Sequence, residues 1–120
     1  MKVSIFTIFI LILAPSIYAQ DMGEGIWLTG EDGRKVKTYY RNGEWFGKLI
    51  SSDNAGAPIG TDVLRHIILE NGVWKGQVYA VKRDMLIDAI IEPADEKIVI
   101  NISVGMFSKT LEWYKETVPK

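Results

Sequence analysis

Short runs of apolar and β-branched residues alternate with glycine, proline and polar residues from about residue 25 onward, at intervals of roughly ten residues. This spacing is typical of antiparallel strands joined by tight turns. We expect about eight strands, over residues 25–29, 35–41, 44–51, 63–70, 73–81, 85–92, 97–104 and 109–115. No helix is needed after the first 19 residues, so the pattern predicts an all-β chain.

Two Asn-Gly pairs, the strongest hairpin signal, open the same pattern, Asn-Gly-x-Trp-x-Gly-x-aliphatic, at residues 42–49 and 71–78. Because side chains alternate along a strand, the Trp, the Gly and the aliphatic residue share one face, which we expect to be the interior. A glycine there leaves room for an indole and lets the strand bend. Two hairpins that share turn chemistry by chance are the alternative.

The longest loop is expected at residues 52–61, which are polar and carry glycine and proline. Antiparallel strands of this number form a sandwich or close into a barrel, and closure removes exposed edges. We predict a small antiparallel up-and-down β-barrel of about eight strands, whose interior is just wide enough for side chains or one small ligand. Outward charges such as Lys37, Lys48 and Glu112 do not fit the apolar lipid face of an outer-membrane barrel.

The first 19 residues carry a lysine, an almost unbroken apolar run and a small residue at Ala19, which is typical of a secretory signal peptide. The run is shorter than the roughly 20 residues of a spanning helix. We therefore expect residues 1–19 to be a signal peptide, residues 20–120 to form one domain, and the mature chain to be periplasmic or secreted without a transmembrane span. An uncleaved anchor is the alternative.

The amino-acid composition excludes several kinds of functional site. The chain has no cysteine, which excludes thiol nucleophiles and thiolate metal sites and leaves the stability of the domain to its core. The formal net charge is −1 and basic runs are absent, so we expect no nucleic-acid partner. No serine has the histidine or lysine setting of a nucleophile. We expect neither an enzyme nor a bound cofactor or metal.

Gly25-Ile26-Trp27 resembles the Gly-x-Trp that opens lipocalins, where the indole closes one end of the barrel. The wider pattern adds Asp32-Gly33, residues 46–50, Gly60 with Val63-Leu64, residues 74–79 and residues 111–115. Together these resemble a family of short exported bacterial lipocalin-like proteins, a domain of unknown function with a calycin-type barrel, over essentially the whole mature chain. The resemblance implies a fold and a compartment, and no activity.

Two departures from that family stand near the ends of predicted strands. Ala80-Val81-Lys82 replaces an Asp-Pro turn, and Lys115 replaces a terminal arginine. In lipocalin-like barrels that arginine packs over the first-strand tryptophan. The resemblance therefore implies that Lys115 is a cation–π partner of Trp27, without the flat guanidinium face that stacks well.

Five residues are candidates for a ligand site in the barrel interior: Trp27, Trp45, Trp74, Trp113 and His66. An aromatic lining suits an apolar ligand, whereas core filling with at most a shallow pocket is the competing and favoured interpretation of the tryptophans. His66 alternates with Leu64 and Ile68, so we expect it to be buried with a hydrogen bond or to lie at the barrel mouth.

The leading hypothesis is a non-enzymatic exported module that binds a small hydrophobic ligand or an envelope component at the barrel mouth near residues 52–61. The alternative is a protein-interaction or inhibitor-type barrel that acts through its outer face and loops. Tyr39, Phe46 and Tyr79 in one contiguous exposed patch would favour this alternative.

Overall fold

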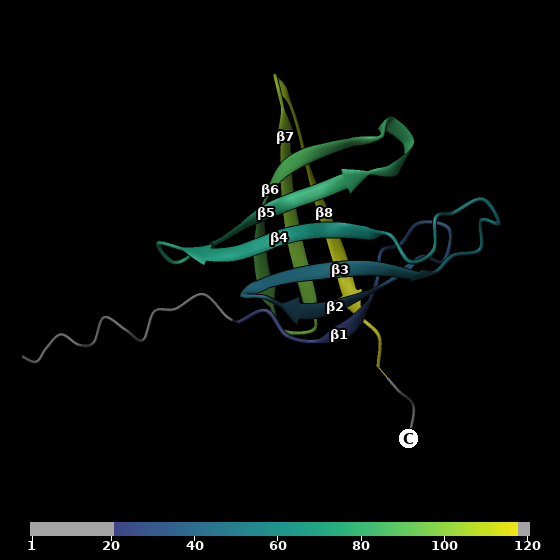
Figure 1. Ribbon diagram of the computed structural model, residues 1–120, viewed down its shortest axis with the longest axis horizontal. Coiled ribbons are helices and arrows are strands. Elements are labelled where there is room, and N and C mark those ends of the chain that lie inside the picture. The colour runs from purple at the N-terminus through teal and green to yellow at the C-terminus, as the bar shows by residue number, and fades with distance from the viewer. Residues whose placement is uncertain (1–20, 118–120) are drawn as a thin grey trace, which may run out of the picture.

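A computed structural model describes residues 21–117 of the chain (Figure 1). The predicted signal peptide therefore lies outside the described residues. Eight strands follow one another: β1 (Gly25–Leu28), β2 (Lys35–Arg41), β3 (Glu44–Ser51), β4 (Asp62–Glu70), β5 (Val73–Ala80), β6 (Met85–Ala94), β7 (Lys97–Val104) and β8 (Phe107–Lys115). A 3-10 turn, η2 (Val81–Arg83), separates β5 from β6.

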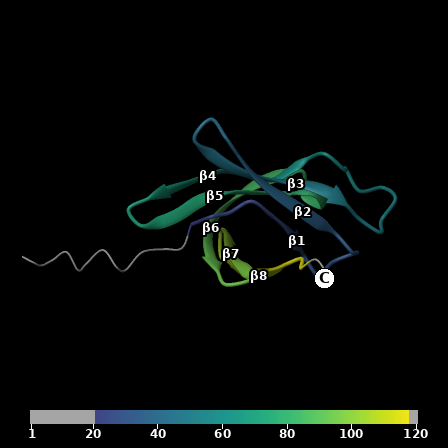
Figure 2. The same ribbon diagram turned by 90° about the horizontal axis from the view of Figure 1, so that it is seen from below.

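Each strand pairs antiparallel with the next, and β1 pairs with β8 to close the sheet. The up-and-down barrel predicted from the strand spacing is therefore confirmed, and the sandwich is excluded. Figure 2 shows β2 to β5 curving over one side, with β7 and β8 on the other. Each turn is short, apart from the loop at residues 52–61, so neighbours along the chain become neighbours in the sheet.

Two strand limits differ from the prediction by two residues, and the others agree to within one residue. β6 continues through Pro93, which lies opposite Ile98 of β7, whereas the predicted strand ends at residue 92. β8 starts at Phe107 rather than Lys109, because Phe107 still pairs with Val104 across the hairpin. Both hairpins are therefore tighter than residue type alone suggested.

The repeated Trp-x-Gly pattern faces the interior as predicted, but the glycines make room for aliphatic side chains. A Cβ at Gly47 would lie 2.9 Å from Val36 Cγ1, and one at Gly76 would lie 2.6 Å from Ile67 Cγ1. Neither space is occupied by an indole. The glycines let neighbouring strands approach closely enough for Val36 and Ile67 to fill the centre of the barrel.

One hydrophobic core fills the space between the strands. Its fully buried members include Leu49, Leu64, Ile67, Ile98 and Ile100. Several aliphatic side chains come from β6 and β7, where every second residue points inward. The interior is thus packed by side chains from all sides of the barrel, as expected for about eight short strands.

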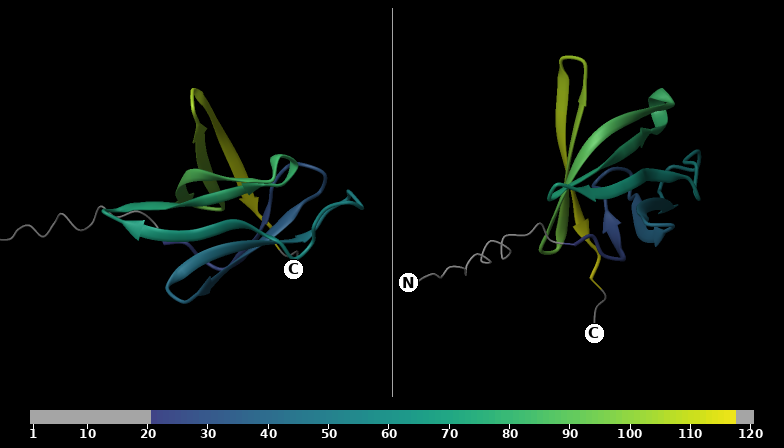
Figure 3. Two further views of the ribbon diagram at one scale, coloured as in Figure 1. Left: turned by 45° about the horizontal axis from the view of Figure 1, so that its top comes forward. Right: turned by 60° about the vertical axis from the view of Figure 1, so that its left-hand side comes forward.

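Neighbouring strands of the barrel are paired over different lengths. β6 and β7 pair from Ala94 and Lys97 only as far as Ala89 and Ile102, and the strands diverge beyond that point. β7 and β8 remain paired to the hairpin tip at Val104 and Phe107. Figure 3 shows this hairpin standing clear of the β5–β6 hairpin. One end of the barrel is therefore splayed into separate hairpins.

Candidate functional site

The four tryptophans lie in or against the same hydrophobic core. Trp27, Trp74 and Trp113 are buried, and Trp45 packs half-buried at the margin of the core. The ring of Trp45 meets that of Tyr40 edge to face, with 5.3 Å between centroids. The predicted inward direction of the indoles is confirmed, and the indoles act as core residues. Their role as ligand contacts stays a prediction.

A polar contact holds Trp27 in place at one end of the barrel. The indole Nε1–H donates to Thr38 Oγ1 at 3.0 Å, and the Thr38 hydroxyl donates to the Gly23 carbonyl at 2.6 Å. Thr38 is fully buried and Trp27 is buried, so these bonds satisfy a hydroxyl and an indole N–H that lie away from water. They tie the segment before β1 to the barrel.

The expected cation–π contact of Lys115 with Trp27 is not observed. Lys115 lies opposite Trp27 in the β1–β8 register. Its Cε lies 3.4 Å from where a Cβ of Gly25 would be. In the described part of the chain, the cations that stand over aromatic rings are those of Arg41, Lys48, Arg65 and Lys97. The end of this barrel is thus closed without the stacked cation of the resembled family.

Hollows open at the surface beside two of the tryptophans. One, of about 260 Å³, lies beside Trp27 and Lys115, between residues 21–24 and the β6–β7 turn. The other lies at the rim beside Trp74. Neither is lined by a residue of the loop at 52–61, where the sequence placed the ligand, nor by Trp45, Trp113 or His66. The five candidate residues therefore do not converge on one hollow.

The placement of His66 in the barrel interior is wrong. His66 has a φ of +53°, and the β4–β5 register shifts between Arg65 and Ile68. This β-bulge inserts one residue into β4, so Leu64 and Ile67 both point inward and His66 points outward. Regular two-residue alternation, which predicts His66 on the face of Leu64, does not hold across the bulge.

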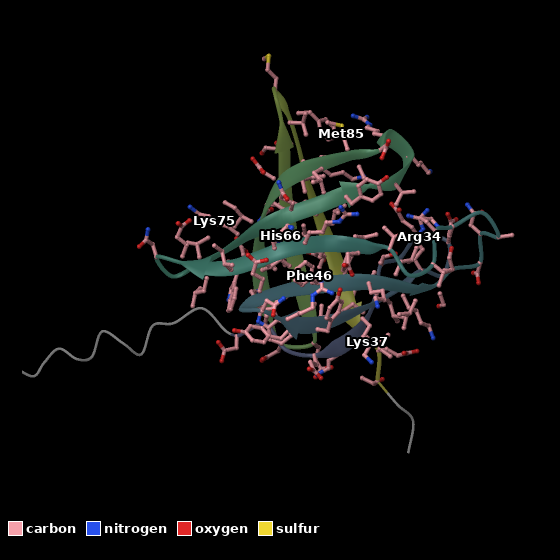
Figure 4. The ribbon with its side chains drawn as sticks, viewed as in Figure 1. Arg34, Lys37, Phe46, His66, Lys75 and Met85 are labelled. Carbon is pink, nitrogen blue, oxygen red and sulfur yellow. The ribbon has the colours of Figure 1, made fainter. Side chains whose placement is uncertain are left out.

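On the outer face, His66 completes a cluster around Phe46, which we call the aromatic cluster: Tyr39, Arg41, Phe46 and His66. Phe46 lies on the outside of β3 and yet is only 6% exposed. Tyr39 stacks on it at 5.6 Å, the His66 ring meets it edge to face at 5.3 Å, and the Arg41 guanidinium lies 4.8 Å from its centroid. Figure 4 shows Phe46 and His66 side by side on this face.

Hydrogen bonds continue the cluster at both of its sides. His66 Nδ1 lies 2.7 Å from Glu44 Oε1, and the Tyr39 hydroxyl donates to Asp62 Oδ1 at 2.6 Å. Arg65 donates from Nε to the Asp62 carbonyl at 2.7 Å, and its guanidinium lies 4.7 Å from the centre of the Tyr79 ring. A continuous strip of aromatic and charged side chains therefore crosses the outer face from β2 to β5.

The two tyrosines of this strip have altered acidities. Burial raises the pKa of Tyr39, and the hydrogen bond to Asp62 and the charge of that carboxylate raise it further. The pKa of Tyr79 is raised mainly by the hydrogen bond that its hydroxyl donates to Asp84 at 2.5 Å. Both phenols therefore stay neutral, and act as donors, at any physiological pH.

Beside the aromatic cluster, two lysines face each other across β2 and β3. Lys37 lies opposite Lys48 in the strand register, and both are exposed. Neither forms an ion pair within the described residues. Like charges directly opposite each other destabilise a sheet. Alternation along the sequence predicts that both lysines point outward. That they lie opposite each other depends on the register of β2 and β3, which the two-residue turn at Asn42-Gly43 sets.

Other kinds of site are not seen between residues 21 and 117. This part of the chain holds no group of three or more histidine, aspartate or glutamate side chains arranged to hold a metal ion. None of its helical segments has the length and hydropathy of a membrane span. The strip from β2 to β5 and the hollow beside Trp27 are the candidate binding sites of the described chain.

No protein-family model matches the chain, and neither a curated protein nor a solved structure is significantly similar to it. The function is therefore inferred from the geometry of this chain.

Proposed function

We propose that this chain is an exported, non-enzymatic barrel of lipocalin-like type, periplasmic or secreted, that binds an acidic partner protein through the outer face of β2 and β3. The observation that carries the proposal is the pair Lys37 and Lys48, two exposed like charges opposite each other with no ion pair in the described chain. A carboxylate-bearing partner removes their mutual repulsion.

The aromatic cluster gives this basic pair a rigid support. Tyr39 and Phe46 form the next outward cross-strand pair beside Lys37 and Lys48. Lys48 Nζ stands 5.4 Å from the centre of the Tyr39 ring. Arg41 adds a third cation on the same outer face of the hairpin. Aromatic and arginine side chains held in place before binding are typical of interface anchors, because little conformational entropy is lost on contact.

The packed core also favours the outer face. Buried side chains from Met22 and from strands β1 to β8 pack into one core, and the hollows beside Trp27 and Trp74 open at the surface. A small apolar ligand needs a concave site that covers most of its surface. The hollow beside Trp27 supports this second candidate, in which a small ligand binds there and perturbs the indole.

Fluorescence anisotropy with labelled poly-L-glutamate tests the acidic-partner proposal. The unaltered protein is expected to bind, with an affinity that falls as salt is added. The K37E/K48E variant is expected to bind about tenfold more weakly or worse, since each exposed charge pair contributes up to ~1 kcal/mol and four such terms change.

The matched control is K75E/K82E, which makes the same charge change at two exposed lysines outside the β2–β3 face. Figure 4 shows Lys75 far from Lys37. If both double variants lose the same affinity, binding depends on net charge and not on this face, and the proposal fails. The second candidate function is tested by titrating small apolar ligands and measuring the change in tryptophan fluorescence, which W27F should abolish if the ligand binds beside Trp27.

A further inference from the structure

β8 extends well past the strand that closes the barrel against it. β1 pairs with β8 at two positions only, Trp27 with Lys115 and Leu28 with Tyr114. On its other side β8 pairs with β7 from Phe107 to Tyr114 without interruption. Residues 107–113 of β8 therefore have a strand on one side and an open edge on the other.

The direction of the backbone groups identifies which residues form this edge. The Lys115 N–H donates to the Glu96 carbonyl on the β7 side, whereas the Glu116 N–H donates to the Ile26 carbonyl on the β1 side, both at 2.8 Å. Successive residues of a strand point their N–H and C=O groups to opposite sides. The even-numbered residues Ser108, Thr110 and Glu112 therefore direct both groups into the open edge.

We propose that this edge pairs with β8 of a second copy of the chain, antiparallel about a two-fold axis, with Thr110 opposite Thr110. In this register Ser108 of each copy lies opposite Glu112 of the other. All three edge residues of both copies then exchange backbone hydrogen bonds. An open edge is a template for such pairing, and Thr–Thr pairs are favourable across strands.

Charge repulsion and the pairing of β1 with β8 each exclude one neighbouring register. Opposing residues of a two-fold antiparallel pair lie on the same face, so the register moves in steps of two residues. One step in one direction places Lys109 opposite Lys109, which is repulsive. One step in the other places Ser108 opposite Tyr114, whose edge is already taken by Leu28. The proposed register opposes no like charges, because Lys109 faces Leu111.

The shape of the hairpin leaves the edge accessible. Phe107 is 52% exposed and Met106 is fully exposed at the tip, and Figures 1 and 3 show the tip projecting beyond β5 and β6. In the proposed dimer Phe107 lies opposite Trp113 of the other copy. Pairing therefore removes exposed apolar surface as well as satisfying the edge backbone groups.

Cysteine cross-linking tests both the pairing and its register, because the chain has no cysteine of its own. Opposing Cα atoms in a hydrogen-bonded antiparallel pair lie about 5.5 Å apart, within the range that a disulfide spans. T110C is expected to form a disulfide-linked dimer at least about tenfold faster than S108C, whose two copies would lie four residues apart in this register. Equal rates for the two variants would overturn the register.

Sedimentation velocity over a concentration series tests the contact itself. T110P removes the edge N–H but leaves the N–H groups of Lys109 and Leu111 that pair with β7, so the hairpin tolerates it. T110A is the matched control, because both variants lose the hydroxyl that donates to Asn101. The unaltered protein and T110A should dimerise and T110P should not.

A monomeric unaltered protein at every concentration would refute the proposal, as would a T110P variant that dimerises like T110A. The K37E/K48E variant should dimerise normally, so a failure of the acidic-partner proposal is distinguishable from a failure of this one. If T110P does not fold, as judged by circular dichroism, the comparison of T110C with S108C still decides.

Discussion

The indole N–H of Trp27 donates a hydrogen bond to the Thr38 hydroxyl across the β1–β2 pair, 3.0 Å from nitrogen to oxygen. The same hydroxyl donates to the Gly23 carbonyl. One buried threonine thus satisfies a donor on the first strand and an acceptor on the segment that covers the end of the barrel. This bond couples the sheet to its closure.

Replacing Thr38 with valine should lower the free energy of unfolding by about 1–3 kcal/mol, because the Trp27 N–H and the Gly23 carbonyl lose their buried partner. Urea denaturation followed by tryptophan fluorescence measures the change. T38S keeps the hydroxyl and should lose clearly less. A T38V variant as stable as the unaltered protein would show that water replaces the hydroxyl.

A methyl group at Gly76 should also destabilise the barrel, by roughly 1–3 kcal/mol, since overpacking forces neighbours out of their positions. The added Cβ would lie 2.6 Å from Ile67 Cγ1 and 2.9 Å from the Arg65 carbonyl. Gly23 has no atom within 4 Å of the corresponding position, so G23A is the control. Equal midpoints of the two variants in urea would contradict the close approach of β4 and β5.

The bulge at His66 predicts an unusual order of stability. Valine resists a positive φ, whereas asparagine tolerates it. Both H66V and H66N lose the contact of the imidazole with Glu44. The difference between their free energies of unfolding therefore reports the cost of the positive φ at residue 66. H66V should be less stable than H66N by about 1–2 kcal/mol in urea denaturation. The reverse order would indicate that residue 66 lies in regular strand and points inward.

Tyr39 makes the stability of the fold fall at alkaline pH. Its raised pKa means that the folded protein keeps the phenol proton above the ordinary value of 10.0. This stabilisation is complete below that value and is lost as pH rises through the pKa of the folded state. The extra free energy of unfolding of the unaltered protein over Y39F should therefore shrink as the pH rises above about 10. Urea midpoints across this range measure it, with Y40F, at an exposed tyrosine, as the control.

The sequence by itself determined the strands, their order and most of their directions. Asn-Gly pairs and two-residue alternation act between neighbours along the chain, so the Asn42-Gly43 turn and the inward Trp45 and Trp74 were predictable. The outward direction of Lys37 and Lys48 was predictable in the same way. Local sequence patterns therefore predict the fold class and the outward direction of the two lysines of the proposed binding face.

Only the tertiary structure decided where His66 points, what fills the space beside Gly47 and Gly76, and how far β1 covers β8. A bulge is an extra residue accommodated against two neighbouring strands, and residue type along β4 does not reveal it. The number of residues over which β1 pairs with β8 depends on the stagger between these two strands, which lie at opposite ends of the sequence. These features arise from contacts between residues distant in sequence, and they place both the aromatic cluster and the open edge of β8.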